Sequence, residues 1–225
     1  MLPPEFELHW AESFRIIPSR FPPVGLFDDV TDPADLDAVF ELEGMTNSRL
    51  RQDAGDISLV PPDRRIAGPG TTPIMAAFTH PNPDGSRFSD GRFGVYYAAA
   101  NRDTAIAETV HHREIFLNAT REPTCEVEQR CYVATIRGRV HDIRDGWEAV
   151  HDPDSYAASQ RLASELYDSR SNGLVYRSVR HSGGQCVAAF YPDLISNCVQ
   201  HCHLLYRWNG SKIDRIIVSD QVTQR

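Results

Sequence analysis

The chain has 225 residues, of which 41% are hydrophobic and 24% are charged, and its formal net charge at pH 7 is −8. These values fit a folded chain with a core of ordinary size, and we expect one domain over residues 1–225. The acidic balance argues against a nucleic-acid-binding surface, which is usually basic overall. No apolar run reaches the roughly 18 residues of a membrane helix, and the opening MLPPEFELHWAESF does not resemble a signal peptide. We therefore expect a cytoplasmic protein that binds neither nucleic acid nor a membrane.

The five cysteines favour free thiols over a disulfide framework, because their number is odd and no secretion signal is recognised. The run CVQHCH, residues 198–203, brings two thiols and two imidazoles close together. A zinc site needs four ligands with a recurring spacing, and no second half of such a site is found. We interpret the run as buried or edge-strand residues and expect no metal, with zinc as the alternative.

The first third of the chain predicts a strand and a helix. SFRIIP gives a short strand at 14–17 that prolines end. TDPADLDAVFELEG predicts a helix that Asp32 caps and that stops at Gly44, with Pro33 in its first turn. IMAAFTH is either a strand or a short buried helix.

The middle of the chain predicts two more strands and a long helix. FGVYYAAA has the composition of a strand. Asn101 can cap a helix that runs to about Phe116. CYVATIRGRVHDIR predicts either two short strands or one strand that bends at Gly138.

The last third predicts one helix followed by short strands. The helix begins at Asp152 and Pro153 and ends before Gly173. The strands are expected in GLVYRSV, QCVAAFYP, HLLYRW and KIDRIIV. Because most strands are late and closely spaced, the pattern favours an α+β fold with a mixed or antiparallel sheet.

The segment SRFSDGRFGVYYAAANRDTAIAE, residues 86–108, has polar groups where a plain strand needs none. Arg87 could fork onto a phosphate or pyrophosphate, and Gly91 and Gly94 would let a ligand approach the backbone. Tyr97 could stack on a ring or bind a ribose. The alternative is a surface arginine, a turn and a core tyrosine.

Glu108 is the acid in the helix that follows this strand. Cleavage of an N-glycosidic bond passes through a state with positive charge at the ribose. A carboxylate that holds the sugar hydroxyls and faces that charge would stabilise it. An anion clamp, an aromatic wall and one carboxylate fit a dinucleotide that is split at its nicotinamide ribose.

Two further segments carry unexplained polar residues. In YRSVRHSGGQCVAAF, Ser178 precedes a Gly-Gly turn and could bind an anion, although a hairpin with a polar turn explains the pattern equally. No G-x-S-x-G motif marks it as a hydrolase nucleophile. In SFRIIPSRF, Arg15 interrupts an apolar strand, and its partner would be a carboxylate or a ligand phosphate.

These segments together resemble the RES domain family, which is named for its characteristic Arg, Glu and Ser. SRFSDGRFGVYYAA is similar to the family's Arg block, TAIAET to its Glu block, and GLVYRSVRHSGG with CVAAFYP to its Ser block. FRIIPSRFPP resembles the opening arginine strand. The blocks occur in the family's order, and the resemblance covers about Phe14 to Pro192.

The resemblance implies an ADP-ribosyltransferase-like domain with a split, mostly antiparallel sheet flanked by helices. It implies an enzyme that consumes NAD, by phosphorolysis with inorganic phosphate to ADP-ribose 1-phosphate and nicotinamide, or by ADP-ribosylation of a protein. It also implies a toxin of a toxin–antitoxin pair with an Xre-like antitoxin as partner, and it is compatible with a homodimer. A non-catalytic NAD- or nucleotide-binding module and a structural interaction protein are the alternatives from other classes.

Carried over by position, the family's Arg, Glu and Ser fall on Arg87, Glu108 and Ser178. Its tyrosine falls on Tyr97 and its opening arginine on Arg15. The expected roles are as follows: Arg15 and Arg87 bind the pyrophosphate or an incoming phosphate, and Tyr97 packs on the nicotinamide or its ribose. Glu108 orients the ribose hydroxyls, and Ser178 binds the nicotinamide-ribose end or the acceptor phosphate. Compared with the shortest family members, residues 26–76 have the character of an insertion within the domain.

Overall fold

A seven-stranded sheet forms the centre of the computed structural model, which describes residues 2–19, 27–28, 30, 32–36, 38 and 55–219. Its strands are β1 (Glu5–Pro18), β2 (Tyr96–Ala99), β3 (Cys125–Asp142), β4 (Gly173–Arg177), β5 (Gln185–Ala189), β6 (Ile195–Trp208) and β7 (Ile213–Ser219). The α-helices in the described residues are α3 (Thr72–Thr79), α4 (Arg102–Ala119) and α5 (Ala157–Asp168). Short 3-10 helices are η1 (Pro33–Asp35), η2 (Ile57–Leu59), η3 (Pro62–Arg64), η4 (Glu148–His151) and η5 (Pro192–Leu194).

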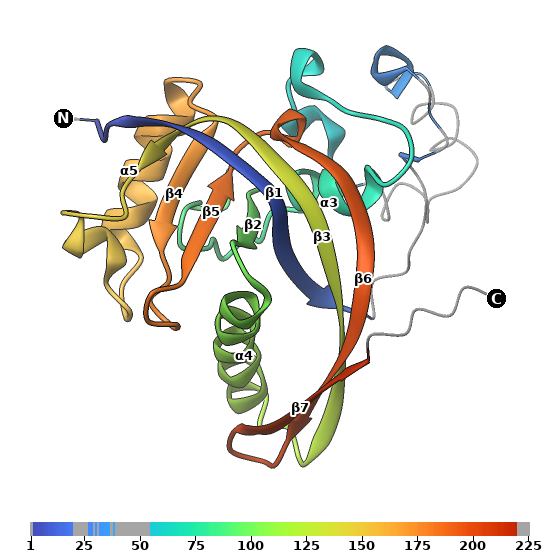
Figure 1. Ribbon diagram of the computed structural model, residues 1–225, viewed down its shortest axis with the longest axis vertical. Coiled ribbons are helices and arrows are strands. Elements are labelled where there is room, and N and C mark those ends of the chain that lie inside the picture. Colours follow the sequence, from blue (N-terminus) through green and yellow to red (C-terminus); the bar gives the residue numbers. More distant parts are fainter. Residues whose placement is uncertain are drawn as a thin grey trace.

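The sheet has a long part and a short part. The long part is the antiparallel series β1-β3-β6-β7, and the short part is β2-β5-β4. β1 meets β2 at the single register pair Phe14–Ala99, and β3 meets β4 only at its last residues, His141 and Asp142. In Figure 1 the long strands curve side by side while β4, β5 and β2 lie to their left. The expected α+β fold with a mostly antiparallel sheet and flanking helices is therefore confirmed, since β3–β4 is the one parallel pairing among the strands of the described residues.

Two strands are longer than their sequence patterns predict. β1 begins at Glu5, and it pairs with β3 along nearly its whole length. β6 includes CVQHCH as well as HLLYRW. Both strands alternate buried and exposed residues, and most of their exposed residues are polar, so a search for apolar runs detects only part of each strand. β3 is one strand, and Gly138 within it has a φ of 151°, which other residues rarely adopt.

The helices decide one open alternative and correct one expectation. IMAAFT lies in helix α3, so the short buried helix is the correct alternative. α5 begins at Ala157, later than Asp152, because the Asp152 carboxylate accepts hydrogen bonds from the backbone N–H groups of Asp154 and Ser155 and so closes a turn first. None of the helices within the described residues combines the length and apolar character needed to cross a bilayer.

The described part of region 26–76 joins the main core. Phe27, Leu36 and Val60 are buried in the same cluster as the strands, and the Asp28 carboxylate accepts from the N–H and hydroxyl of Thr72 at the start of α3. Asp32 caps η1 as expected. The remainder of the predicted helix to Gly44, and most of TNSRLRQDAG, lie outside the described residues.

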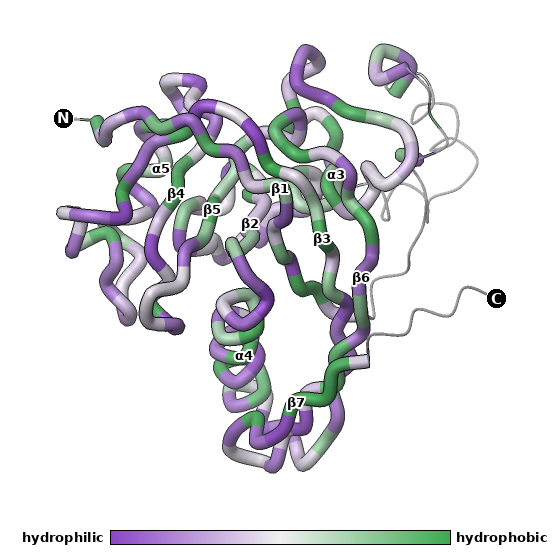
Figure 2. The backbone as a smooth tube through the Cα atoms, in the orientation of Figure 1, coloured by the Kyte–Doolittle hydropathy of each residue, from purple (hydrophilic) through white to green (hydrophobic). Residues whose placement is uncertain are grey.

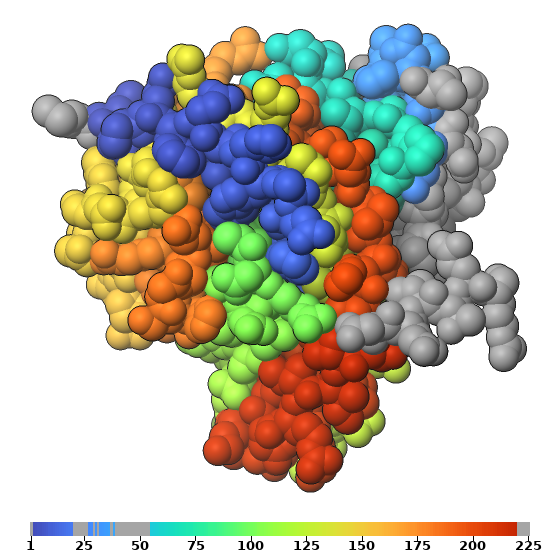
Figure 3. Space-filling model, viewed as in Figure 1, coloured from blue at the N-terminus to red at the C-terminus, as the bar shows by residue number. Residues whose placement is uncertain are grey.

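The helices cover different portions of the sheet. α5 packs beside β4, α3 contacts β2 and β6, and α4 lies against β1 and β2 (Figure 1). The hydropathy colouring in Figure 2 shows α4 as a mixture of polar and apolar residues along its length. The space-filling view in Figure 3 shows β1 running across the surface of one face. The gap between the two parts of the sheet is thus bordered by α4, which places the residues of that helix beside both parts.

Candidate functional site

A pocket of about 260 Å³ lies where the two parts of the sheet separate beneath α4. One wall comes from β1 and β3, and the opposite wall comes from β2, β4 and β5. α4 contributes positions spaced three and four residues apart, which share one helical face. These positions are Ala105, Glu108, Thr109, His112 and Arg113. The pocket therefore collects side chains from segments that are far apart in the sequence.

The start of α4 fixes where its carboxylate lies. The Asn101 side chain accepts a hydrogen bond from the N–H of Thr104 at 2.9 Å, as an N-cap residue does. Asp103, in the first turn, places a negative charge near the positive end of the helix dipole and so stabilises the helix. Seven residues after the cap, Glu108 lies on the face that lines the pocket.

Glu108 and Ser178 are joined by a direct hydrogen bond. The Ser178 hydroxyl donates to Glu108 Oε1 at 2.6 Å. The same hydroxyl oxygen accepts from the backbone N–H groups of Arg180 and His181, at 3.1 and 2.9 Å. These two donors direct the serine proton toward the carboxylate. β4 and β5 form an antiparallel hairpin, as the alternative interpretation expected. Ser178 lies in the connection between these two strands, next to Glu108.

Gly184 allows the β4–β5 connection to press against α4. A Cβ atom at this position would lie 2.6 Å from Thr104 Oγ1, and Thr104 is fully buried. Thr104 Oγ1 also makes a 2.8 Å hydrogen bond with His181 Nδ1. The small residue and this hydrogen bond together keep Ser178 within reach of Glu108.

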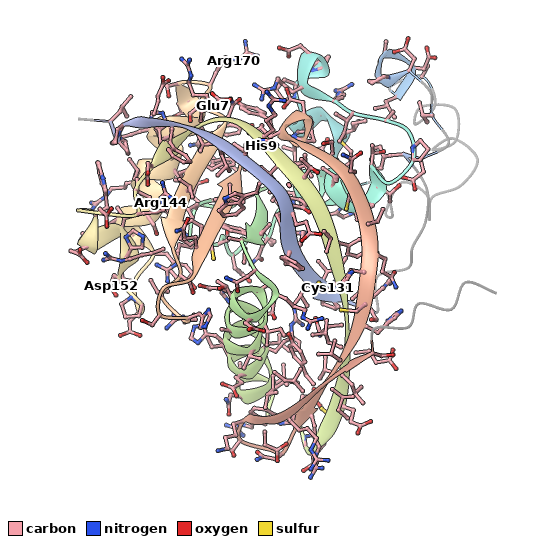
Figure 4. The ribbon with its side chains drawn as sticks, in the orientation of Figure 1. Glu7, His9, Cys131, Arg144, Asp152 and Arg170 are labelled. Carbon is pink, nitrogen blue, oxygen red and sulfur yellow. The ribbon has the colours of Figure 1, made fainter. Side chains whose placement is uncertain are left out.

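Arg87 is held at the pocket by neutral groups. Its side chain belongs to a residue that is only 7% exposed, and its Nη1 donates to the carbonyls of Asp152 at 2.8 Å and Val150 at 3.4 Å. The guanidinium carbon lies 4.6 Å from the centre of the Tyr156 ring. Asp152, labelled at the left of Figure 4, belongs to the segment before α5, and Arg180 donates to the next carbonyl, that of Pro153. Two arginines thus fix this segment at the edge of the site.

Tyr97, and not Tyr96, faces the pocket. Its hydroxyl accepts from the N–H of Phe88 at 2.8 Å and shares a 2.7 Å hydrogen bond with Ser86 Oγ. Burial raises the pKa of Tyr97 to about 12, so the phenol stays protonated at neutral pH. Tyr97 therefore anchors the two residues that flank Arg87. Tyr96 is fully buried on the opposite side of β2.

Arg15 lines the pocket from β1 at the point where β1 and β2 separate. Its Nη1 donates to the Tyr97 carbonyl at 3.0 Å, and its guanidinium lies 4.7 Å from the Tyr96 ring centre. Burial lowers its pKa. Its Nε has no hydrogen-bond partner within the described residues. Both of these partners, the Tyr97 carbonyl and the Tyr96 ring, are uncharged. The carboxylate that was the alternative partner for Arg15 is therefore not found within the described residues.

Three other residues of the first polar segment serve the fold instead of the pocket. Arg92 is exposed and pairs with Asp90 and Asp168. Gly91 has a φ of 99°, and a Cβ there would lie 2.8 Å from the Pro83 carbonyl. A Cβ at Gly94 would lie 2.3 Å from backbone atoms of the α3 region. The expectation that these glycines admit a ligand is wrong, because the protein's own backbone fills the space.

Several site residues were not identified from the sequence. Tyr156 packs on Arg87, and Gln129, His112 and Tyr176 line the pocket. The signal for Gln129 was a polar residue between Val127 and a cysteine in an alternating strand. No comparable pattern distinguishes Tyr156 or Tyr176 from ordinary core tyrosines.

The cysteines of CVQHCH lie in β6, where Cys198 and Cys202 are buried and all five cysteines of the chain are free thiols. The interpretation of this run as strand residues is confirmed. Within the described ranges, no group of three or more His, Cys, Asp or Glu side chains is arranged to hold a metal ion.

Comparisons with known proteins agree with the arrangement of these segments. The sequence pattern of the RES domain matches residues 62–209, which contain Arg87, Glu108 and Ser178 but not Arg15. The uncharacterized protein y4oC of Sinorhizobium fredii (strain NBRC 101917 / NGR234) is 29% identical over 211 residues, covering 93% of this chain and 88% of that protein. A chain in the crystal structure of the M. tuberculosis MbcT–MbcA toxin–antitoxin complex aligns with a TM-score of 0.41 and 13% identity, over 52% of this chain and 72% of that chain. The RES match spans more than half of the sequence and includes the three residues that line or adjoin the pocket, so this chain belongs to the RES domain family.

Proposed function

We propose that the protein consumes NAD by cleaving the N-glycosidic bond between nicotinamide and ribose, with inorganic phosphate as the acceptor. The observation that carries this proposal is the Ser178–Glu108 hydrogen bond of 2.6 Å beside a pocket that Arg87 and Arg15 also line. Membership in the RES domain family supports it, because the family includes enzymes that deplete NAD. The products are ADP-ribose 1-phosphate and nicotinamide.

The proposed step is a displacement at C1′ of the nicotinamide ribose. An oxygen of phosphate forms the new bond to C1′, while the bond from C1′ to the ring nitrogen breaks. The electron pair of the broken bond returns to the pyridinium ring, which leaves as neutral nicotinamide. Positive charge develops on the ribose in this transition state. The Glu108 carboxylate stabilises that charge and accepts hydrogen bonds from the ribose hydroxyls.

The two arginines provide the positive charge that the phosphate groups require. Within the described residues their hydrogen-bond partners are carbonyl groups, at Val150 and Asp152 for Arg87 and at Tyr97 for Arg15. A guanidinium whose protein partners are neutral keeps its full charge for a ligand. We assign both groups to the pyrophosphate of NAD or to the incoming phosphate, and Ser178 to the orientation of Glu108.

We also propose that the protein is the toxin of a toxin–antitoxin pair and acts in the cytoplasm. Support comes from the RES family, whose members pair with Xre-like antitoxins. Expression of the chain alone should lower cellular NAD and stop growth, and co-expression of its antitoxin should restore both. Growth arrest with unchanged NAD would contradict this assignment.

Incubation of the purified protein with NAD, with and without inorganic phosphate, tests the reaction. Mass analysis should find nicotinamide and ADP-ribose 1-phosphate, and both should depend on added phosphate. ADP-ribose attached to a protein, without a requirement for phosphate, would identify a protein ADP-ribosyltransferase instead. Binding of NAD without release of nicotinamide would identify a non-catalytic nucleotide-binding module.

A further inference from the structure

Gln129 is a buried amide in the wall of the pocket. It belongs to β3, between Pro18 of β1 and Leu204 of β6 in the sheet register. By strand alternation it shares a face with Val127 and Cys131. The residue is 1% exposed and lines the pocket.

The Gln129 Nε2 group has no hydrogen-bond partner within the described residues. A buried donor without a partner destabilises the folded state, because it has given up its hydrogen bonds to water. Most buried polar atoms in proteins are paired, so an unpaired one in a pocket wall points to a ligand. Arg15 also lines this pocket, and its Nε likewise has no partner within the described residues. The Gln129 Nε2 group is a donor, so the partner that it lacks must supply an acceptor.

The lining also includes apolar side chains, beside the polar residues already described. On the face of the sheet that carries Gln129 lie Phe14 and Ile16 of β1, and Ala99 and Ala105 border the same pocket. The pocket volume of about 260 Å³ lies below the usual range for drug-sized ligands, roughly 300–1,000 Å³. Such a space accommodates one base with its ribose. Apolar side chains beside an amide donor suit a flat ring that carries a carbonyl group.

We propose that Gln129 is a specificity residue that donates a hydrogen bond from Nε2 to the carboxamide oxygen of the nicotinamide ring. This inference rests on the proposed function, in which Glu108 binds the nicotinamide ribose, because the base next to that ribose is then the one in the pocket. Gln129 selects a pyridine base that carries a carbonyl acceptor. It takes no part in the displacement at C1′.

The first test compares Gln129→Met with the wild-type protein. Methionine has nearly the same length and no donor. We expect the wild-type protein to bind nicotinamide about fivefold to tenfold more tightly than 3-methylpyridine, which keeps the ring and lacks the carbonyl. Gln129→Met should bind the two compounds equally, while Gln200→Met, on β6 and away from the pocket lining, should behave as wild type. Equal binding of the two compounds by wild type, or unchanged discrimination in Gln129→Met, would overturn the proposal.

Thermal unfolding of the same variants separates binding from structural support. Because Nε2 has no protein partner, Gln129→Met should unfold at the same temperature as wild type or higher. A marked loss of stability, or failure to fold, would show that the amide supports the fold, and would count against the proposal. In wild type, saturation with nicotinamide should also shift the side-chain amide NMR signal of Gln129, and an unmoved signal would contradict it.

The failure of this inference can be distinguished from failure of the proposed function. If nicotinamide binding depends on Gln129 but NAD is not cleaved, the specificity assignment stands and the proposed reaction is wrong. If NAD is cleaved by wild type and Gln129→Met with the same kcat/KM, and nicotinamide still binds to the variant, only the specificity assignment is wrong.

Discussion

The hydrogen bonds of the Ser178 hydroxyl indicate that it positions the Glu108 carboxylate. It takes two backbone N–H groups on its oxygen and gives its proton to Glu108. A hydrogen bond to a charged group contributes about 1.5–3 kcal/mol, and here its loss would free the carboxylate to rotate. These contacts therefore suit a serine that orients the carboxylate and do not suit a serine that acts as a nucleophile.

Ser178→Ala should therefore lower kcat for NAD cleavage by about 10- to 100-fold, with a smaller effect on KM. Ser171→Ala is the matched control, because Ser171 lies just before β4 and its hydroxyl forms hydrogen bonds with the backbone of nearby Gly173. Steady-state kinetics of both variants provide the measurement. Equal effects of the two substitutions would remove Ser178 from the site.

Arg87 and Arg92 have the same side chain but differ in burial and in their partners. Arg87 is buried at the pocket with neutral partners, whereas Arg92 is exposed and bound to two aspartates. Arg87→Lys keeps the charge but loses the planar fork that binds two oxygens at once. We expect its KM for NAD to rise by about tenfold, since one charge-assisted hydrogen bond is lost. Arg92→Lys should leave KM unchanged, and a similar rise in both variants would argue against phosphate binding by Arg87.

Residues of this site could be predicted where the sequence showed both a chemically unusual residue and a motif in the expected order. Arg87, Glu108 and Ser178 were placed by three family blocks, and Arg15 by its unusual position in an apolar strand. Gln129 was missed because β3 alternates with the exposed Glu126 and Glu128, which makes that part of the strand look polar. The partners of Arg87 are backbone carbonyls of η4 and the segment after it, and a carbonyl has no signature in a sequence.

At the scale of elements, α4 is the part whose position matters most to the site. It supplies one face of the pocket, and its first turn contacts the β4–β5 connection through Thr104 and His181. Its start was predicted correctly from Asn101, since capping is a local property. The start of α5 was predicted too early, because Asp152 caps a turn and two arginines hold the carbonyls that follow.

Asn101→Ala should reduce the free energy of unfolding by about 1 kcal/mol, the usual effect of losing an N-cap. Asn118→Ala, at the other end of the same helix, is the control, and we expect it to change stability by less than about 0.5 kcal/mol. Asn118 is exposed, and its side chain donates only to the Glu114 carbonyl one turn earlier. Urea unfolding of the two variants gives the comparison. If Asn101→Ala unfolds at the same midpoint as Asn118→Ala, the cap does not stabilise α4.

At the scale of the whole molecule, the pocket exists because the sheet divides. β1 and β3 continue together while β2, β5 and β4 turn away. The two parts are joined by one register pair between β1 and β2 and by two between β3 and β4. The division depends on pairings such as Phe14 with Ala99, which are distant in sequence. Local patterns predicted the α+β class and most strands, but they contain no information on which strands pair.

The pH dependence of stability follows from a histidine behind Arg87. Burial lowers the pKa of His151, and Arg177 and Arg87 lower it further. Below its ordinary pKa of about 6.5 the unfolded chain therefore binds more protons than the folded protein at this residue. Above about pH 6.5 the imidazole is neutral in both states and does not reduce the free energy of unfolding. As the pH falls from there, the free energy of unfolding declines by at most about 1.4 kcal/mol per pH unit.

His151→Asn removes this titration and keeps a donor for the Trp147 carbonyl that His151 Nδ1 contacts. Its unfolding free energy should fall less steeply than that of wild type between about pH 6.5 and 5. His9→Asn, at an exposed position on β1, is the control and should follow wild type. Parallel curves for wild type and His151→Asn would show that the buried imidazole does not affect acid stability.

The central claim is that the Glu108 carboxylate stabilises the breaking bond to nicotinamide. The most direct measurement is the rate of nicotinamide release from NAD by Glu108→Gln, with Glu114→Gln as the control. Glu114 lies on the same helix, and its Oε1 accepts from the N–H of Ile213, a contact that glutamine can keep. We predict a loss of about 100-fold or more in kcat for Glu108→Gln, since a charge is removed from the transition state, and a normal rate for Glu114→Gln. Near-normal release of nicotinamide by folded Glu108→Gln would contradict the claim.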